Sequence, residues 1–280
     1  MNISTIIPIH EFNEVISGHL DKAIESIIKQ EGEIPDLFIV YAAELENQIN
    51  EFKTSMILKH QENLAFNANN LITLIKNEGN TDYQTQVNLA VKSVTTEYFS
   101  VLEFDDEYST TFFRNATKYI DAYPEIDVFL TMMIEVNEKN EGIKLTNETV
   151  WAQQFVGENG EMGYLNTNAL KQYTDFKLSG AVIKKSEFQN IGGYKSNIKL
   201  TFMYEFLLRA LNNACKIFSM PKIGYKHLAT REGSLFDNYQ KNMPIDERKF
   251  WFDTAGKEAN YINDRVIDTS RLQKIVVSEK

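Results

Sequence analysis

Residues Ser100–Tyr108 have the sequence SVLEFDDEY, in which a short apolar run ends in four acidic side chains within five positions. The preceding residues favour a β-strand over Tyr98–Phe104, so the carboxylates stand at the carboxyl end of that strand. Neighbouring carboxylates repel one another unless water or a cation compensates their charge. The sequence therefore leaves two interpretations, a solvated strand end and a metal site.

The segments on either side of this cluster alternate between strand and helix patterns. We expect strands at Ile3–Ile9, Asp36–Ala42, Leu71–Ile75, Ile126–Val136, Leu178–Lys184 and Lys216–Met220. We expect helices at Gly18–Gln30, Glu44–Lys53, Asp82–Ser93, Thr111–Ala122, Ser186–Asn190 and Met203–Asn213. Such alternation predicts an α/β fold with a mostly parallel central sheet flanked by helices, whose ligands bind beyond the carboxyl ends of the strands. The acidic cluster lies at such an end.

Length, composition and charge further limit the class of protein. The chain has 280 residues, of which 43% are hydrophobic, enough for a substantial core. It contains no apolar run of transmembrane length and no signal peptide at its N-terminus, and its single cysteine fits a reducing compartment, so we expect a cytoplasmic protein without membrane insertion. The net charge of −10 argues against broad, non-specific nucleic-acid binding, although Lys and Arg gather locally around Lys184 and Lys226.

Four segments in order along the chain resemble those of family-2 glycosyltransferases with the GT-A (Rossmann-like) fold. They are Ser4–Gln30 (STIIPIHEFNEVISGHLDKAIESIIKQ), Gly79–Glu107 (GNTDYQTQVNLAVKSVTTEYFSVLEFDDE), Leu178–Tyr194 (LSGAVIKKSEFQNIGGY) and Tyr204–Leu235 (YEFLLRALNN through GYKHLATREGSL). The resemblance implies a transferase domain over residues 1–235. Residues 236–280 then form a C-terminal helical extension packed on that domain through Phe250, Trp251 and Phe252.

The resemblance also implies an activity, the inverting, metal-dependent transfer of a hexose from a UDP-sugar to a hydroxyl group. Mn²⁺ or Mg²⁺ would bridge the donor phosphates and stabilise the departing diphosphate. Asp105 is the expected metal ligand, Glu103 replaces the family's first Asp, and His227 is the expected third ligand.

Nucleotide-sugar contacts are expected from four regions. The family's Asp-Asp-Gly-Ser turn is replaced by Tyr41-Ala42-Ala43-Glu44, so base recognition must differ. The residues that we expect to contact the donor, besides the metal ligands, are Pro8, His10, Glu11, Tyr41, Asp82, Gln86, Lys226 and Arg231.

The catalytic base is harder to place, because the spacing back from Arg209 puts Phe202-Met203 where the family has Glu-Asp. Glu205 is the only acidic residue of that helix and is therefore the expected base, with Asp175 and Glu187 as poorer substitutes. The residues expected at the acceptor pocket are Trp151, Ser179, Gly180 and Gly193.

The acceptor is left open between two classes. The size, composition and family type are similar to those of the T-even phage enzymes that add a second glucose to glucosylated hydroxymethylcytosine in DNA, which would place the protein in the host cytoplasm. A bacterial surface glycan is the alternative acceptor. A Lys/Arg cluster beside the acceptor pocket would favour DNA, and an apolar groove with aromatic platforms would favour a glycan. A third interpretation is a catalytically decayed protein that binds nucleotide sugars or carbohydrate.

Overall fold

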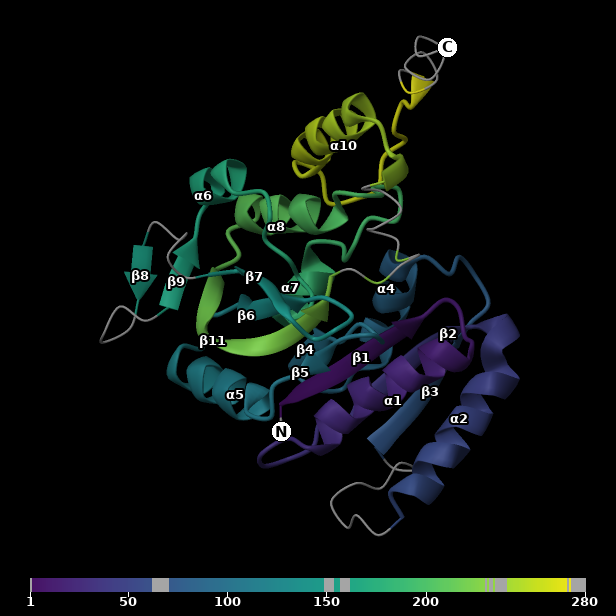
Figure 1. The fold of residues 1–280 in the computed structure, drawn as a ribbon. Coiled ribbons are helices and arrows are strands. Elements are labelled where there is room, and N and C mark those ends of the chain that lie inside the picture. Colours follow the sequence, from purple (N-terminus) through teal and green to yellow (C-terminus); the bar gives the residue numbers. More distant parts are fainter. Residues whose placement is uncertain are drawn as a thin grey trace.

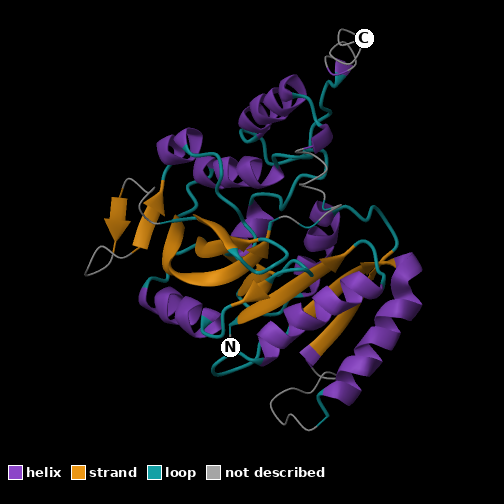
Figure 2. Ribbon diagram, viewed as in Figure 1, coloured by secondary structure: helices purple, strands orange, loops and turns teal. Residues whose placement is uncertain are grey.

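The computed structural model describes residues 2–61, 71–148, 154–156, 162–229, 231, 234, 241–270 and 272. Within these ranges the chain forms one curled β-sheet with helices on both faces (Figures 1 and 2). None of the described helices has the length and apolar character needed to span a lipid bilayer.

The strands and helices follow the chain in an alternating order. The strands are β1 (Ile3–Ile9), β2 (Leu37–Ala42), β3 (Ile72–Asn77), β4 (Tyr98–Val101), β5 (Glu107–Tyr108), β6 (Val128–Val136), β7 (Gly142–Thr146), β8 (Gln154–Val156), β9 (Met162–Leu165), β10 (Val182–Lys184) and β11 (Ile217–Leu228). The helices are α1 (Glu14–Ile28), the 3₁₀ turn η1 (Ala43–Leu45), α2 (Glu46–Lys59), α4 (Tyr83–Ser93), α5 (Phe112–Ala122), α6 (Thr167–Gln172), α7 (Lys185–Asn190), α8 (Phe202–Asn212) and α10 (Ile245–Glu258).

The sheet has the strand order β3-β2-β1-β4-β10-β6-β11-β9-β8, with β5 paired to β11 and β7 to β6. Strands β3, β2, β1 and β4 are all parallel, as is the long pair of β6 with β11. Strand β10 lies antiparallel between β4 and β6 and joins the two halves. The predicted α/β class, with helices flanking a largely parallel sheet, is confirmed.

Two hydrophobic layers hold the helices against the sheet. Helices α1, α2 and α5 bury apolar side chains in one layer, including Leu20, Phe52 and Phe112. Helices α4, α6, α7 and α8 pack into the other layer, including Val87 and Phe206. Because both faces are covered, a central strand such as β1 is buried along its whole length, which explains its nearly continuous apolar sequence.

Two capped helices begin near the carboxyl edge of the parallel strands. The Asn13 side chain accepts a hydrogen bond from the Ile16 amide and starts α1 shortly after β1. Asp82 caps α4 in the same way, through the Thr85 amide. Within α4, the Gln86 side chain accepts from the Ile9 amide at 3.0 Å and donates to the Ile9 carbonyl at 3.1 Å. Gln86 thereby fixes the end of β1, the strand that leads into the site.

Several strand boundaries differ from those predicted, and two of these differences shape the site. Strand β4 ends at Val101 instead of Phe104, so residues 102–106 form a turn. Strand β11 continues past Met220 to Leu228, with register shifts on either side of Ile223. Pro221 and Gly224 interrupt the apolar pattern there, as bulges commonly do, which is why the sequence suggested an earlier end.

The C-terminal helix α10 lies against α8, as Figure 1 shows at the top of the molecule. Its Trp251 is buried, and the Trp251 carbonyl accepts a hydrogen bond from Thr201 Oγ1 at 2.9 Å. The Asn212 side chain donates to the Ala259 carbonyl at 3.1 Å. These contacts tie α10 to both ends of α8.

Candidate active site

The acidic turn after β4 is held in place by its neighbours in the sheet. The Leu102 amide donates to the Ile6 carbonyl at 2.9 Å, which continues the pairing with β1 for one residue. The Glu103 amide then donates to the Tyr225 hydroxyl at 3.1 Å, and the Asp106 amide donates to the Glu103 carbonyl at 3.1 Å. The turn therefore lies between β1 and β11, with its carboxylates at the carboxyl edge of the parallel strands.

Asp106 is buried and bound by two groups of β11. One carboxylate oxygen accepts from the Leu228 amide at 2.8 Å, and the other lies 2.9 Å from Nδ1 of His227. Burial of the imidazole opposes its charged form, but the Asp106 carboxylate outweighs that cost and raises the pKa of His227 to about 9. Because Asp106 engages Nδ1, Nε2 of His227 is the nitrogen available to a ligand.

Glu103 is the second buried carboxylate, and it accepts a hydrogen bond from the Ser179 hydroxyl. Its burial, reinforced by the nearby charge of Asp106, raises its pKa to about 7. Glu103, Asp106 and His227 each offer a ligand atom, and these atoms lie within 4.8 Å of one another.

Asp105 is paired with Arg231, whose Nε lies 2.5 Å from a carboxylate oxygen. The guanidinium also lies over the Phe104 ring, 5.0 Å from its centroid, and within 4.0 Å of a Glu11 oxygen. Burial and the charge of Asp106 raise the pKa of Asp105, while Arg231 opposes that rise.

These groups line a cavity of about 370 Å³. The predicted site residues that line it are Pro8, His10, Glu103, Asp105, Ser179, His227 and Arg231. Further lining residues, which the sequence did not single out as a set, are Tyr83, Lys177, Lys199, Phe202, Met203, Tyr204, Arg248 and Phe252. Asp175, one of the two substitute bases that the sequence suggests, also lines the cavity.

The arrangement suits a hard divalent cation. Carboxylate oxygens are the ligands that Mg²⁺ and Mn²⁺ prefer, and an imidazole oriented by a carboxylate on its other nitrogen is a common second-sphere pattern at metal sites. His227 held by Asp106 has that pattern. The ligand atoms that lie together belong to Glu103, Asp106 and His227. Asp105, the expected metal ligand, is paired with Arg231 beside them.

Several predicted donor and acceptor residues lie away from the cavity. Tyr41 is buried inside β2, Asp82 caps α4, and Gln86 holds the end of β1. Lys226 pairs with Glu107, at 2.5 Å, on the β11–β5 edge. Glu11 is half exposed beside Arg231, and Trp151 lies outside the described residues.

The two glycines predicted at the acceptor pocket serve packing. Gly180 has φ +68°, and a Cβ there would collide with the Tyr225 ring. Gly193 has φ +69°, and a Cβ there would lie 2.6 Å from the Asn88 side-chain oxygen. Gly193 is not among the residues that line the cavity, whereas Gly180 supports the ring that holds the Glu103 amide.

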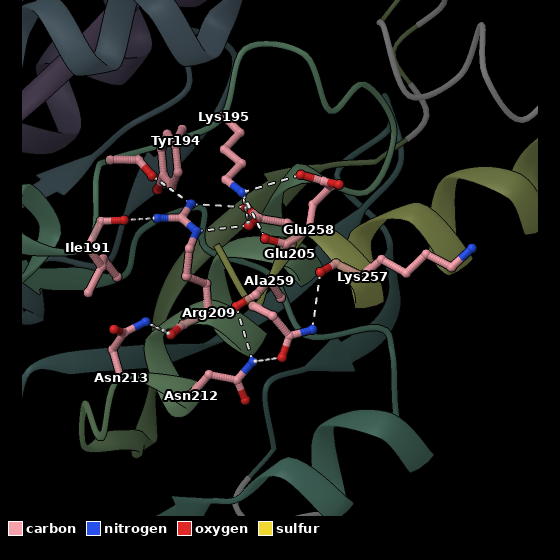
Figure 3. A network of polar contacts seen from close by, with 12 residues as sticks. Ile191, Tyr194, Lys195, Glu205, Arg209, Asn212, Asn213, Lys257, Glu258 and Ala259 are labelled. Carbon is pink, nitrogen blue, oxygen red and sulfur yellow. Dashed lines mark hydrogen bonds and ion pairs between the residues drawn. The ribbon is translucent and has the colours of Figure 1, made fainter. Parts of the chain in front are cut away.

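Glu205, the expected base, is fully buried in a network of charged groups (Figure 3). Its carboxylate accepts from Arg209 at 2.8 and 2.9 Å and lies 3.5 Å from the Lys195 ammonium. Arg209 also donates to the Ile191 and Gly193 carbonyls. The structure brings Met203, an earlier residue of α8, to the cavity in its place.

Glu187, the second substitute base, lies on α7 and is not among the residues that line the cavity. Of the three carboxylates considered for the base, Asp175 is therefore the one that the structure brings to the cavity.

Comparison with known proteins relates the chain to others by structure alone. No family model matches the sequence, and no curated protein matches it. Among solved structures, S. aureus TarS residues 1–349 in complex with UDP-GlcNAc superposes with a TM-score of 0.63 at 18% identity, over 92% of this chain and 66% of that one. The same protein in complex with UDP superposes with a TM-score of 0.58 at 14% identity, over 91% of this chain and 80% of that one.

The fold of the chain is therefore the GT-A fold. This confirms the architecture that the resemblance implied. A curled sheet flanked by helices carries the acidic turn at the carboxyl edge of its parallel strands. At 18% identity the likeness concerns the fold, and the chain spans just under two thirds of the first of these structures.

The His227–Asp106 pair predicts how the stability of the metal-free protein depends on pH. The folded pKa of about 9 lies above the ordinary value of 6.5, so the stabilisation is complete below pH 6.5 and is lost as the pH rises to 9. We expect the unfolding free energy, measured by urea titration in EDTA, to fall by about 3 kcal/mol over that window. His227→Gln should remove most of the fall, and His19→Gln on α1 is the matched control. An equal fall in wild type and His227→Gln would contradict the assignment.

The buried network predicts that Glu205→Gln acts on stability. Removing the negative charge leaves Arg209 without a carboxylate partner in the interior and leaves Lys195 with Glu258 alone, which costs about 3–5 kcal/mol in unfolding free energy. Denaturant titration measures the loss, with Glu51→Gln on the exposed face of α2 as the matched control. A Glu205→Gln protein with wild-type stability and reduced turnover would instead restore Glu205 as the base.

Proposed function

We propose that the protein is an inverting, metal-dependent glycosyltransferase that moves glucose from UDP-glucose to a hydroxyl group. The observation that carries the proposal is the cavity at the carboxyl edge of β1 and β4, which gathers three carboxylates, an oriented imidazole and a guanidinium. Open α/β sheets bind their ligands at this edge. The structural likeness to TarS bound to UDP-GlcNAc and to UDP supports a uridine nucleotide sugar as donor.

We assign the donor side of the cavity to the diphosphate. Mn²⁺ or Mg²⁺ would bind at Glu103, Asp106 and His227, with Asp105 as a further ligand beside them. When bound, it would supply Lewis-acid stabilisation of the leaving diphosphate. Arg231 already lies beside Asp105 and brings a second positive charge to the same place. Pro8 and His10, at the end of β1, line the cavity where the nucleoside would extend.

Asp175 is our choice of catalytic base. Among the described residues, the carboxylates that line the cavity are Glu103, Asp105 and Asp175. The first two belong to the proposed metal site, so Asp175 is the one left to accept the proton of the attacking hydroxyl. Its carboxylate is paired with the Lys144 ammonium at 2.5 Å, a counter-charge that lies outside the proposed metal site.

We propose DNA carrying glucosylated hydroxymethylcytosine as the acceptor. Lys199 and Arg248 line the cavity and could compensate phosphate charge, whereas Lys177, which also lines it, is paired with Glu135 at 2.9 Å. The same cavity has aromatic walls at Phe202, Tyr204 and Phe252, which also suit a sugar ring. A bacterial surface glycan is therefore the second candidate acceptor.

One observation favours a non-catalytic binding protein instead. Helix α8 presents Met203 to the cavity and buries Glu205, so no carboxylate of this helix lines the cavity. If Asp175 does not act as the base, the cavity would bind a nucleotide sugar without turning it over.

UDP release tests the donor chemistry. We expect metal-dependent release of UDP from UDP-glucose with Mn²⁺ and none with EDTA. Asp105→Asn should reduce the rate at least about 100-fold, since it weakens the metal site and leaves Arg231 without its partner. Glu44→Gln, an exposed change of equal charge after β2, is the control. Absence of metal-dependent turnover or binding with a panel of UDP-sugars would exclude the enzyme.

A second variant separates the enzyme from the binding protein. Asp175→Asn should bind UDP-glucose and Mn²⁺ with wild-type affinity, measured by calorimetry. Its transfer to an acceptor should fall about 100-fold or more, because the base is lost. Wild-type transfer by Asp175→Asn would remove Asp175 as the base.

A further inference from the structure

A second groove adjoins the cavity on the side of the C-terminal helix. It has a volume of about 610 Å³ and lies between the segment before α8 and the chain that follows α10, with Asn197, Trp251, Arg265 and Thr269 among its lining residues. Lys199 lines both this groove and the cavity. The two spaces therefore meet at one cationic side chain, and a long ligand could occupy both.

Positive side chains follow this path although the chain as a whole carries a net charge of −10. Arg248 of α10 lines the cavity, Lys199 stands at the junction, and Arg265 lines the groove. Neither Lys199 nor Arg265 forms a side-chain ion pair with another described residue. Asp264 also lines the groove, with one oxygen 3.4 Å from the Ser196 hydroxyl, and is its one acidic member among the described residues.

Exposed aromatic rings accompany these cations. Phe252 is 36% exposed at the cavity, with its ring centroid 5.6 Å from that of Tyr204. Tyr261, beside the groove but not among its lining residues, is 47% exposed, and the Arg265 guanidinium covers one face of its ring at 3.9 Å. Alternating cations and flat rings are the surface that single-stranded or extruded nucleotides require, because phosphates pair with the cations and bases stack on the rings.

Hydrogen bonds and ion pairs fix the backbone segments that border the groove. The Lys195 ammonium donates to the Glu258 carbonyl at 2.8 Å and reaches the buried Glu205 carboxylate, so α10 is bound to the charged network below α8 (Figure 3). The Asn197 side chain donates to the Arg265 carbonyl at 2.5 Å, which ties the segment after α10 to the segment before α8. The backbone segments that carry Lys199 and Arg265 are therefore held in place by these contacts.

We infer that the C-terminal extension is the acceptor-binding element and that its ligand is a nucleic-acid strand. The strand backbone lies across Lys199 and Arg265, and the acceptor nucleotide enters the cavity beside Arg248 and Phe252, toward Asp175. This assignment rests on the proposed function for its direction of entry. A neutral glycan would leave the cations unused, and a polyol-phosphate chain would leave the rings unused.

Binding of the full-length protein to fluorescent duplex DNA containing glucosylated hydroxymethylcytosine, measured by anisotropy against salt, tests the inference. Lys199→Ala and Arg265→Ala should each weaken binding about 3- to 10-fold at low salt and reduce the salt slope by about one. Arg265→Ala, at a residue that lines the groove and not the cavity, should bind UDP-glucose as the wild type does. Lys22→Ala on α1 and Lys118→Ala on α5, exposed on the opposite layer, are the matched controls.

Each outcome of the binding experiment either supports or overturns the assignment of this surface to nucleic acid. Unchanged DNA affinity and salt slope in both variants would overturn the inference. Salt-sensitive binding of a polyol-phosphate polymer in place of DNA would also overturn it. Salt-sensitive DNA binding that needs Lys199 and Arg265, in a protein that releases no UDP, would support this surface and contradict the proposed donor chemistry instead.

Discussion

Compensation of buried negative charge is the constraint on which the site depends. Residues 103–106 place three largely buried carboxylates in a small volume, and each has a partner from elsewhere in the fold: Ser179 for Glu103, Arg231 for Asp105 and His227 for Asp106. An isolated buried carboxylate is costly, so each partner must be present for the turn to fold. Strand β11 and the segment after it supply two of the three, which is why this long strand runs past the end of β4.

Buried charge must also be compensated beneath α8, but there the carboxylate is used for stability and not for catalysis. Glu205 compensates Arg209 and Lys195 in the interior, and these cations in turn hold the Ile191, Gly193 and Glu258 carbonyls. A carboxylate committed to two buried cations has no oxygen to offer a substrate. Glu205 therefore stabilises the interior beneath α8, and the catalytic base that we propose is Asp175 at the cavity.

The sequence predicted the architecture well, because apolar periodicity records which faces are buried. It also placed Pro8, His10, Asp105, His227 and Arg231 at one cavity through the order of motifs. It failed where side-chain direction depends on a turn: the sequence predicted Asp105, Glu103 and His227 as the metal ligands, but β4 ends at Val101 and the turn brings Asp106 to His227. The sequence predicted that Tyr41 and Gln86 contact the donor. Neither hydrophobic periodicity nor residue propensity shows that the fold buries Tyr41 and uses Gln86 to hold β1. The α10 residues at the cavity carried no local signal, since their proximity arises from long-range packing.

Gly180 and Tyr225 have a consequence for sequence variation among relatives of this chain. The Tyr225 ring occupies the space where a side chain at position 180 would lie, and its hydroxyl accepts from the Glu103 amide. A larger residue at 180 requires a smaller one at 225, which removes the hydroxyl and frees the backbone of the acidic turn. The two positions should therefore vary together, and their joint change would mark a branch in which the first carboxylate of the turn is held by other means.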